Sequence, residues 1–271
     1  MNTNFKSLCA VATLAALLFA SFSDEFAQKA RAVFNKNKDA VVTVQLVVKS
    51  KLSMQGSPSR SSESRQEVTG AVVDPSGLAV VSLSSIDPGQ MMQNLTSGDR
   101  IKMESELADL KILLPNGDEV PCEVLLRDND LDLAFIKPKT KPQTPMSALD
   151  LAQAGAAEIG DPIVAINRLG NAAGRAHSIA AERISAIVQR PRLFYVPDAN
   201  MTTSSLGCPC FTLDGKLLGV MVLRATKGAS SAGSFSTQNP NYTGIILPTA
   251  DVQKIARQVP AGGKESGEAP K

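Results

Sequence analysis

Residues Gly70–Ile86 read GAVVDPSGLAVVSLSSI and hold two short apolar segments on either side of a turn. The segments Gly70–Val73 and Leu78–Leu83 are rich in valine and leucine, which suit a half-buried strand. Asp74–Gly77 (DPSG), between them, combines residue types that form tight turns. This stretch therefore predicts two neighbouring β-strands joined by a short turn.

The same succession of short apolar segments and turns continues along most of the chain. Further strands are predicted at Ala40–Val48, Leu110–Leu114, Pro162–Asn167, Ser178–Gln189, Leu193–Val196, Cys210–Leu213, Leu217–Leu223 and Thr243–Ile246. Many short strands with few helical segments are typical of an all-β barrel or sandwich. Lys137–Pro145 (KPKTKPQTP) is rich in proline and lysine and predicts a linker between two β lobes.

Five segments fall outside the strand pattern. The spacing of apolar residues predicts helices at Asp24–Lys38 and Thr249–Gln258. Gly56–Gln66 (GSPSRSSESRQ) is expected to be a polar loop. The charged stretch Asp99–Asp109 is either a solvated helical loop or an insertion that binds a partner. Residues 261–271, rich in Gly, Lys and Glu, are expected to be disordered.

The first 23 residues follow the order of a secretion signal. Lys6 lies in a short polar start, an apolar run extends over Leu8–Ala20, and small residues follow at Ser21 and Ser23. The run is shorter than the about 20 residues that a membrane-spanning helix needs. We therefore expect a signal peptide over residues 1–23, a mature chain that is secreted or periplasmic, and no membrane span.

Composition argues against several function classes. The 28 basic and 26 acidic residues leave a formal net charge of +2, which is too small to attract nucleic acid or acidic lipid over the whole surface. Aromatic residues make up 4% of the chain and tryptophan is absent, so stacking platforms for single-stranded nucleic acid are hard to build. We expect no nucleic-acid partner.

Three cysteines remain once the signal with Cys9 is removed: Cys122, Cys208 and Cys210. An odd count argues against a disulfide framework, and a bond from Cys122 to either of the others is left open. Cys208 and Cys210 lack the third and fourth neighbouring ligands that structural zinc needs. We expect buried apolar cysteines, no metal site and no cofactor.

Three segments together resemble the protease domain of the HtrA/Deg family of trypsin-like serine proteases. Gly70–Ile86 is similar to the family's stretch that ends in T-N-x-H, and Val120–Lys137 (VPCEVLLRDNDLDLAFIK) to its D-x-x-x-D-L-A-x-(L/I)-K motif. Ser204–Val220 (SSLGCPCFTLDGKLLGV) is similar to G-N-S-G-G-P-L followed by a DG hairpin. The resemblance implies two six-stranded antiparallel β-barrels with short N- and C-terminal helices, in one domain over residues 24–260 with lobes at 40–137 and 146–248.

The resemblance also assigns the catalytic positions. Asp132 falls on the triad aspartate, Ser84 on the histidine and Leu206 on the nucleophilic serine. Ser84 is no base and Leu206 has no nucleophilic atom, while Ser204 and Cys208 replace glycines of the turn that forms the oxyanion site. The resemblance therefore implies a protease homologue without catalysis, which binds peptides or partner proteins between its barrels and keeps Asp132 as a structural acceptor.

Two alternatives stay open. Ser205, next to the nucleophile position, would serve an active endopeptidase if a base lay beside it. The domain could also be purely structural, without a ligand.

His177, the one histidine of the chain, is expected in a turn far from Ser84. The sequence does not indicate an oligomeric state.

Overall fold

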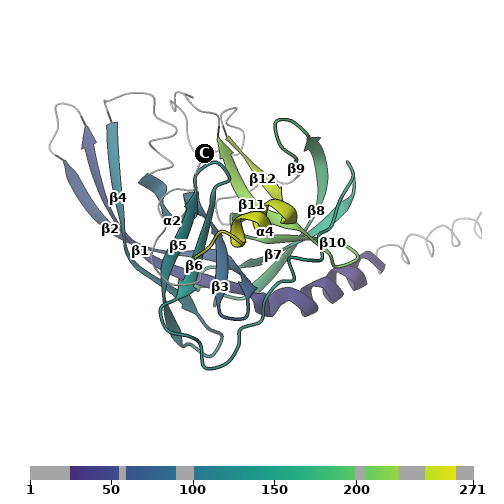
Figure 1. The fold of residues 1–271 in the computed structure, drawn as a ribbon, viewed down its shortest axis with the longest axis horizontal. Helices are drawn as coiled ribbons and strands as arrows, with labels where there is room; N and C mark the ends of the chain where they lie inside the picture. Colours follow the sequence, from purple (N-terminus) through teal and green to yellow (C-terminus); the bar gives the residue numbers. More distant parts are fainter. Residues whose placement is uncertain (1–24, 55–58, 90–100, 199–204, 226–241, 261–271) are drawn as a thin grey trace, which may run out of the picture.

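The computed structural model describes residues 25–54, 59–89, 101–198, 205–225 and 242–260 (Figure 1). The chain forms two closed barrels of six antiparallel strands each. Strand order is β1-β2-β3-β6-β5-β4 in the first barrel and β10-β11-β12-β9-β8-β7 in the second. The predicted all-β fold of two six-stranded barrels is confirmed.

The first barrel contains β1 (Val41–Met54), β2 (Arg60–Asp74), β3 (Leu78–Ser82), β4 (Ile101–Leu113), β5 (Glu119–Asp128) and β6 (Leu133–Pro138). The second contains β7 (Pro162–Arg168), β8 (His177–Val188), β9 (Phe194–Pro197), β10 (Pro209–Thr212), β11 (Leu217–Ala225) and β12 (Tyr242–Pro248).

The helices are few and short. A helix over residues 25–37 leads into the short helix η1 (Lys38–Ala40) before the first barrel. Single turns α2 (Leu83–Ile86) and η2 (Asn171–Ala173) lie between strands, and α4 (Thr249–Ala256) follows the last strand. None of the helices within the described ranges is long and apolar enough to cross a bilayer.

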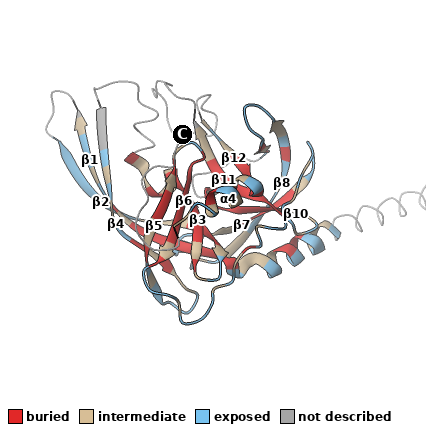
Figure 2. Cartoon of the chain, viewed as in Figure 1, coloured by how far each residue is buried: buried red, intermediate tan, exposed pale blue. Residues whose placement is uncertain are grey.

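Alternation along the strands places apolar side chains both inside and between the barrels. Val42, Val44 and Leu46 of β1 point into the first barrel. Outward-facing residues of both barrels, such as Phe135 and Phe211, form a larger shared cluster, which Figure 2 shows as the buried centre of the molecule. The helix over residues 25–37 and α4 add their apolar faces to this cluster, so both helices are held at the junction of the barrels.

Polar side chains also join the two barrels. Arg175 forms an ion pair with Glu67 of β2 at 2.7 Å, and Arg168 Nε donates to Thr43 Oγ1 at 3.1 Å. Thr69 Oγ1 hydrogen-bonds the side chain of Asn167. Because Thr43 and Thr69 are buried, these directional contacts fix how β1 and β2 sit against the β7–β8 end of the second barrel.

Two sequence predictions were wrong in the described residues. The expected loop at 56–66 is strand from Arg60 on, and the expected helical loop at 99–109 is strand from Ile101 on. The alternative for 99–109, an insertion that binds a partner, stays a prediction. Both strands flank β1 and continue as a three-stranded arm beyond the barrel, where Leu52 pairs with Arg60 and Met54 with Ile101 (Figure 1). Residues 60–65 are exposed on both faces, so they carry no apolar period, although backbone pairing makes them a strand.

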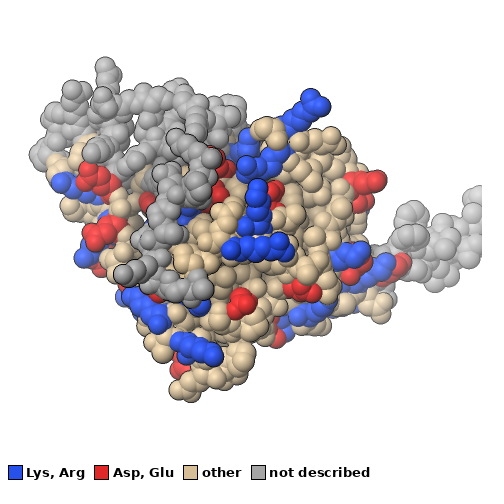
Figure 3. Space-filling view, in the orientation of Figure 1, with Lys and Arg blue, Asp and Glu red and all other residues tan. Residues whose placement is uncertain are grey.

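Charges of both signs are spread over the face seen in Figure 3, with basic side chains gathered over the region of α4. This helix carries Lys254 and is followed by Arg257. The face in view therefore carries no broad surface of a single sign.

The shared cluster makes the fold sensitive to Phe211, whose side chain is 1% exposed. We expect Phe211→Ala to lower the free energy of unfolding by about 3–5 kcal/mol, because it opens a cavity between the barrels. The control Leu193→Ala removes a side chain that is 39% exposed and should change stability by less than about 0.5 kcal/mol. Urea unfolding of both variants is the measurement, and equal losses would contradict a common core between the barrels.

Candidate functional site

Asp132, which lies in the turn before β6, is the centre of a hydrogen-bond network that joins the barrels. Its Oδ2 accepts from Ser82 Oγ at 2.6 Å and from the backbone N–H of Leu223 at 2.8 Å. Its Oδ1 accepts from the backbone N–H of Ser84 at 2.7 Å. Ser82 and Ser84 belong to the first barrel and Leu223 to β11 of the second, so one carboxylate ties together both halves of the molecule.

Two opposing effects act on this carboxylate. Burial raises the pKa of Asp132, because the charged form loses contact with water, while the bonds from Ser82, Leu223 and Ser84 lower it. Burial prevails, since the residue is only 7% exposed. The backbone of Asp132 has a φ of 55°, and its carbonyl accepts from Leu83 N at 2.9 Å. The residue is therefore bound to the first barrel through both its side chain and its backbone.

Ser84 lies in the single-turn helix α2 directly after β3. Its backbone N–H bonds Asp132, so the structure brings together two of the positions that the resemblance singles out. A serine hydroxyl cannot take up a proton near neutral pH as an imidazole does. Ser84 therefore offers the site no general base.

The turn that contains Leu206 packs against the first barrel. Gly207 has a φ of +86°, and its N–H donates to Met221 O at 2.8 Å. A Cβ placed on Gly207 would lie 2.2 Å from Thr69 O and 3.7 Å from Ser82 N. The turn therefore lies beside Ser82, which bonds Asp132.

Leu206 itself is buried, with 4% of its surface exposed. Its aliphatic side chain has no atom that can attack a carbonyl carbon. Ser205, one residue earlier, is half-buried at the start of the same turn, where its carbonyl accepts from Cys208 N at 3.2 Å. Ser204 lies outside the described residues. The site thus combines a well-bonded carboxylate with two side chains that lack catalytic groups.

His177 lies elsewhere, at the start of β8. Its ring nitrogens are within 2.9 Å of Arg168 Nη1, one of them is 3.3 Å from Val41 O, and Phe34 contacts the ring edge-on. Burial and the charge of Arg168 lower the pKa of His177. The imidazole therefore serves the packing of the N-terminal helix against the barrels.

Sequence reasoning missed two partners of Asp132. Ser82 precedes Ser84 by two residues in VVSLSS, and a second serine so near the position assigned to the histidine was a usable signal. The Leu223 contact is made by a backbone N–H, so no residue type in the sequence predicts it.

The cysteines are free and lie in separate barrels. Cys122 belongs to the interior of the first barrel, and Cys208 and Cys210 to that of the second. Cys122 is therefore not bonded to either of the others, which answers the question that the sequence left open. Burial raises the pKa of Cys122 to about 12 and those of Cys208 and Cys210 as well, so these thiols stay protonated. The described residues contain no group of three or more side chains suited to bind a metal ion.

Comparison with known families shows to which family the chain is similar. The family described as "Trypsin-like peptidase domain" matches residues 32–220, which span the first barrel and the second as far as β11. No curated protein matches the sequence significantly.

The Asp132 network predicts a large effect of Asp132→Ala. The change leaves Ser82 Oγ and the N–H groups of Ser84 and Leu223 without their acceptor, so we expect a loss of at least about 2 kcal/mol in the free energy of unfolding. Asp130→Ala removes an exposed carboxylate two residues away and should cost less than about 0.5 kcal/mol. Chemical denaturation measures both, and a small loss for Asp132→Ala would refute its role as a tie between the barrels.

Gly207→Ala tests the close approach of the Leu206 turn. Gly160 has a similar φ of +90° but no atom within 4 Å of an added Cβ, so Gly160→Ala isolates the backbone cost of about 1–2 kcal/mol. We expect Gly207→Ala to cost about 1–3 kcal/mol more, because the methyl group is forced against Thr69 O. The difference between the two variants in thermal unfolding is the readout, and no difference would mean that the turn does not press on the first barrel.

Proposed function

The chain belongs to the trypsin-like peptidase domain family, and from this we propose that it is a secreted, catalytically inactive protease homologue that binds peptides or partner proteins. The observation that carries the proposal is the network of Asp132, which keeps its three donors although neither Ser84 nor Leu206 offers catalytic chemistry. Within the family, we place the chain with the HtrA/Deg proteases, because three of its segments resemble their motifs.

The rate that an incomplete catalytic triad loses is large enough to support inactivity. A serine protease depends on a base that takes the proton of the nucleophile and on an aspartate that orients the base. Removing members of such a triad leaves only about 10³–10⁴-fold acceleration over the uncatalysed reaction. Peptide-bond hydrolysis at that rate is too slow to be useful, so a retained scaffold is better explained by binding.

An open strand edge beside Asp132 supports peptide binding. Residues 221–225 of β11 pair with β12 on one side, and within the described strands nothing continues the sheet on the other side beyond Met221. Leu223 N, on this segment, bonds Asp132. Extended peptides bind proteins by adding a strand to such an edge. Main-chain groups of Leu223 and Ala225 point to the same side as those of Met221, and Leu223 N is taken by Asp132, so we place a bound peptide against Leu223 O and Ala225.

Secretion rests on the signal-like order of residues 1–23, which lie outside the described residues. The free, buried cysteines do not bear on the compartment, because no disulfide forms among the three of them. We propose a location in the periplasm or outside the cell.

The alternative is an active endopeptidase that uses Ser205. Its hydroxyl would need a base within hydrogen-bond reach. The one histidine of the chain contacts Arg168, Val41 and Phe34 at the junction with the N-terminal helix. These contacts argue against the alternative.

Casein hydrolysis by the mature chain tests the proposal. We expect no turnover by the wild type, and turnover by Ser84→His with Leu206→Ser, because this pair restores a base and a nucleophile beside Asp132. The matched control Ser84→His with Leu206→Ala lacks only the nucleophilic oxygen and should be inactive, because no covalent intermediate can form.

Two outcomes decide against the proposal. Wild-type turnover that Ser205→Ala abolishes would mean an active enzyme with a displaced nucleophile. Failure of the wild type to bind a fluorescent casein peptide, measured by anisotropy, would leave a structural domain without a peptide ligand. Saturable binding without turnover is the result we expect.

A further inference from the structure

Arg224 is a half-buried cation on the open segment of β11, and no described acid balances its charge. Its guanidinium carbon lies over the Phe194 ring, 4.9 Å from the ring centre, and this cation–π contact is its one interaction with a described residue. The half-buried Arg175, by contrast, forms an ion pair with Glu67 at 2.7 Å. The N–H donors of the Arg224 guanidinium therefore have no acceptor among the described residues.

The segments next to Arg224 in the sheet and in the sequence offer it no acid. On β12, the residue opposite Arg224 is Thr243, which is uncharged. Residues 199–204 and 226–241, which follow β9 and β11, contain neither Asp nor Glu. A negative charge for Arg224 is therefore best supplied by another molecule.

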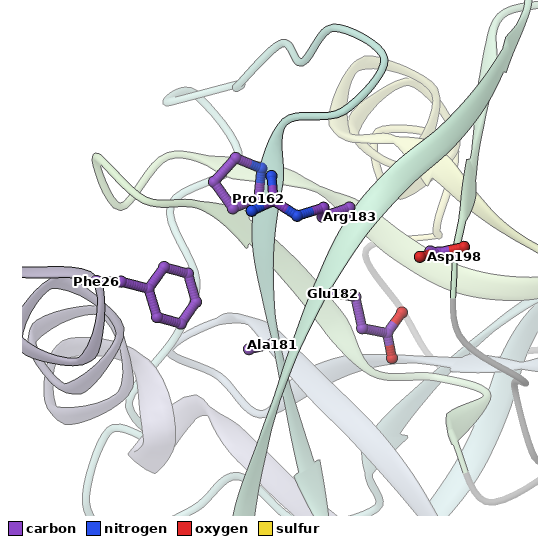
Figure 4. A pocket seen from close by; sticks show the side chains of 6 residues that line it. All are labelled: Phe26, Pro162, Ala181, Glu182, Arg183 and Asp198. Carbon is purple, nitrogen blue, oxygen red and sulfur yellow. The ribbon is translucent and has the colours of Figure 1, made fainter. Parts of the chain in front are cut away.

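Two acids of the second barrel, Glu182 and Asp198, do not fill this role. Figure 4 shows their carboxylates on one side of β8, at a pocket of about 400 Å³. Glu182 is two residues before Ile184, which is buried inside the barrel, so the two side chains point to the same face of the strand. The Phe194 ring belongs instead to the shared cluster outside the barrel. The charge of Asp198 acts on Glu182, and neither acid forms an ion pair with Arg224.

A peptide that pairs with the open edge of β11 places one of its side chains opposite Arg224. The peptide bonds the main chain at Leu223 O and at Ala225, so its residue between these two contacts faces Arg224. Opposite residues on antiparallel strands carry their side chains on the same face of the sheet, with Cβ atoms about 4.5–5.5 Å apart. The side chain of this peptide residue therefore lies within reach of the guanidinium.

We propose that the bound peptide carries an acidic side chain, Asp or Glu, opposite Arg224, and that this charge pair selects the ligand. The inference rests on the proposed function, because it needs a peptide at the β11 edge. A guanidinium can bind a carboxylate through two parallel N–H···O bonds, which gives direction as well as strength. Because Arg224 is half-buried against Phe194, salt screens the pair less than it screens charges that are fully exposed.

NMR titration of the mature chain with three short peptides tests the role of Arg224. The peptides are acetyl-Val-Thr-X-Thr-Val amides in which X is Glu, Gln or Lys, so the blocked ends leave X as the only charge. We expect the Glu peptide to shift the amide signals of Leu223 and Ala225 and to bind at least about 5-fold tighter than the Gln peptide, as a cross-strand charge pair does. The Lys peptide should bind more weakly than the Gln peptide, because like charges repel.

Variants of Arg224 separate its charge from its packing. Arg224→Met keeps an apolar stem and removes the charge, so the preference for Glu over Gln should disappear. Arg224→Glu should reverse it, so that the Lys peptide binds best. The matched control Arg60→Met removes the same charge from the exposed end of the arm and should keep the full preference. Because each variant is judged by the ratio of two affinities, a general loss of stability does not imitate these results.

The outcomes distinguish this inference from the proposed function. Equal affinity for the Glu and Gln peptides, or a preference that survives Arg224→Met, would overturn the inference and leave peptide binding in place. A Gln peptide with a free C-terminal carboxylate that binds as tightly as the Glu peptide would assign Arg224 to a chain end, which also overturns it. If these peptides and the fluorescent casein peptide all fail to bind, the proposed function fails and the inference falls with it.

Discussion

Burying the charge of Asp132 is the constraint on which the arrangement of the two barrels depends. A buried carboxylate is tolerated only where donors replace the water that it has lost. Here they are a hydroxyl and a backbone N–H from the β3–α2 corner and a backbone N–H from β11. Because the donors come from both barrels and Asp132 itself lies just before β6, the carboxylate fixes the end of β3, the start of β6 and one strand of the second barrel at once.

The same constraint explains why the site keeps its shape without a histidine. In a triad, the aspartate that orients the histidine accepts a hydrogen bond from the imidazole N–H. In this chain the Ser82 hydroxyl, at 2.6 Å, lies within short hydrogen-bond distance of the carboxylate. The donors thus hold the β3–α2 corner in place. The shared apolar cluster around Phe211 and Phe135 also holds the barrels together, through hydrophobic burial, which has no preferred direction. Loss of catalytic groups therefore does not require loss of the fold.

The sequence predicted the barrels wherever burial imposed alternation, as in Val42, Val44 and Leu46 of β1, and wherever turn residues such as Asp74–Gly77 marked the ends of strands. It failed for the arm at Arg60–Arg65, because residues that are solvated on both faces carry no period. From Ile101 on, the alternation of Ile101, Met103 and Leu107 with charged residues was a strand signal, which the charge of the stretch obscured. In the site, motif order located Asp132 and Ser84, which proved to be bonded. The donor from Leu223 is a main-chain group that any residue type supplies, so only the fold could reveal it.

Asp132 and Glu182 both have buried carboxylate oxygens, but they differ in whether the folded chain supplies hydrogen-bond donors to them. Burial raises the pKa of both Asp132 and Glu182. Asp132 meets three donors from its own chain, so its charge is accounted for by the folded structure itself. Glu182 Oε2 meets none within the described residues and has Asp198 beside it. Asp132 therefore helps to hold the two barrels together, whereas Glu182 Oε2 makes no bond with a described residue that could do the same.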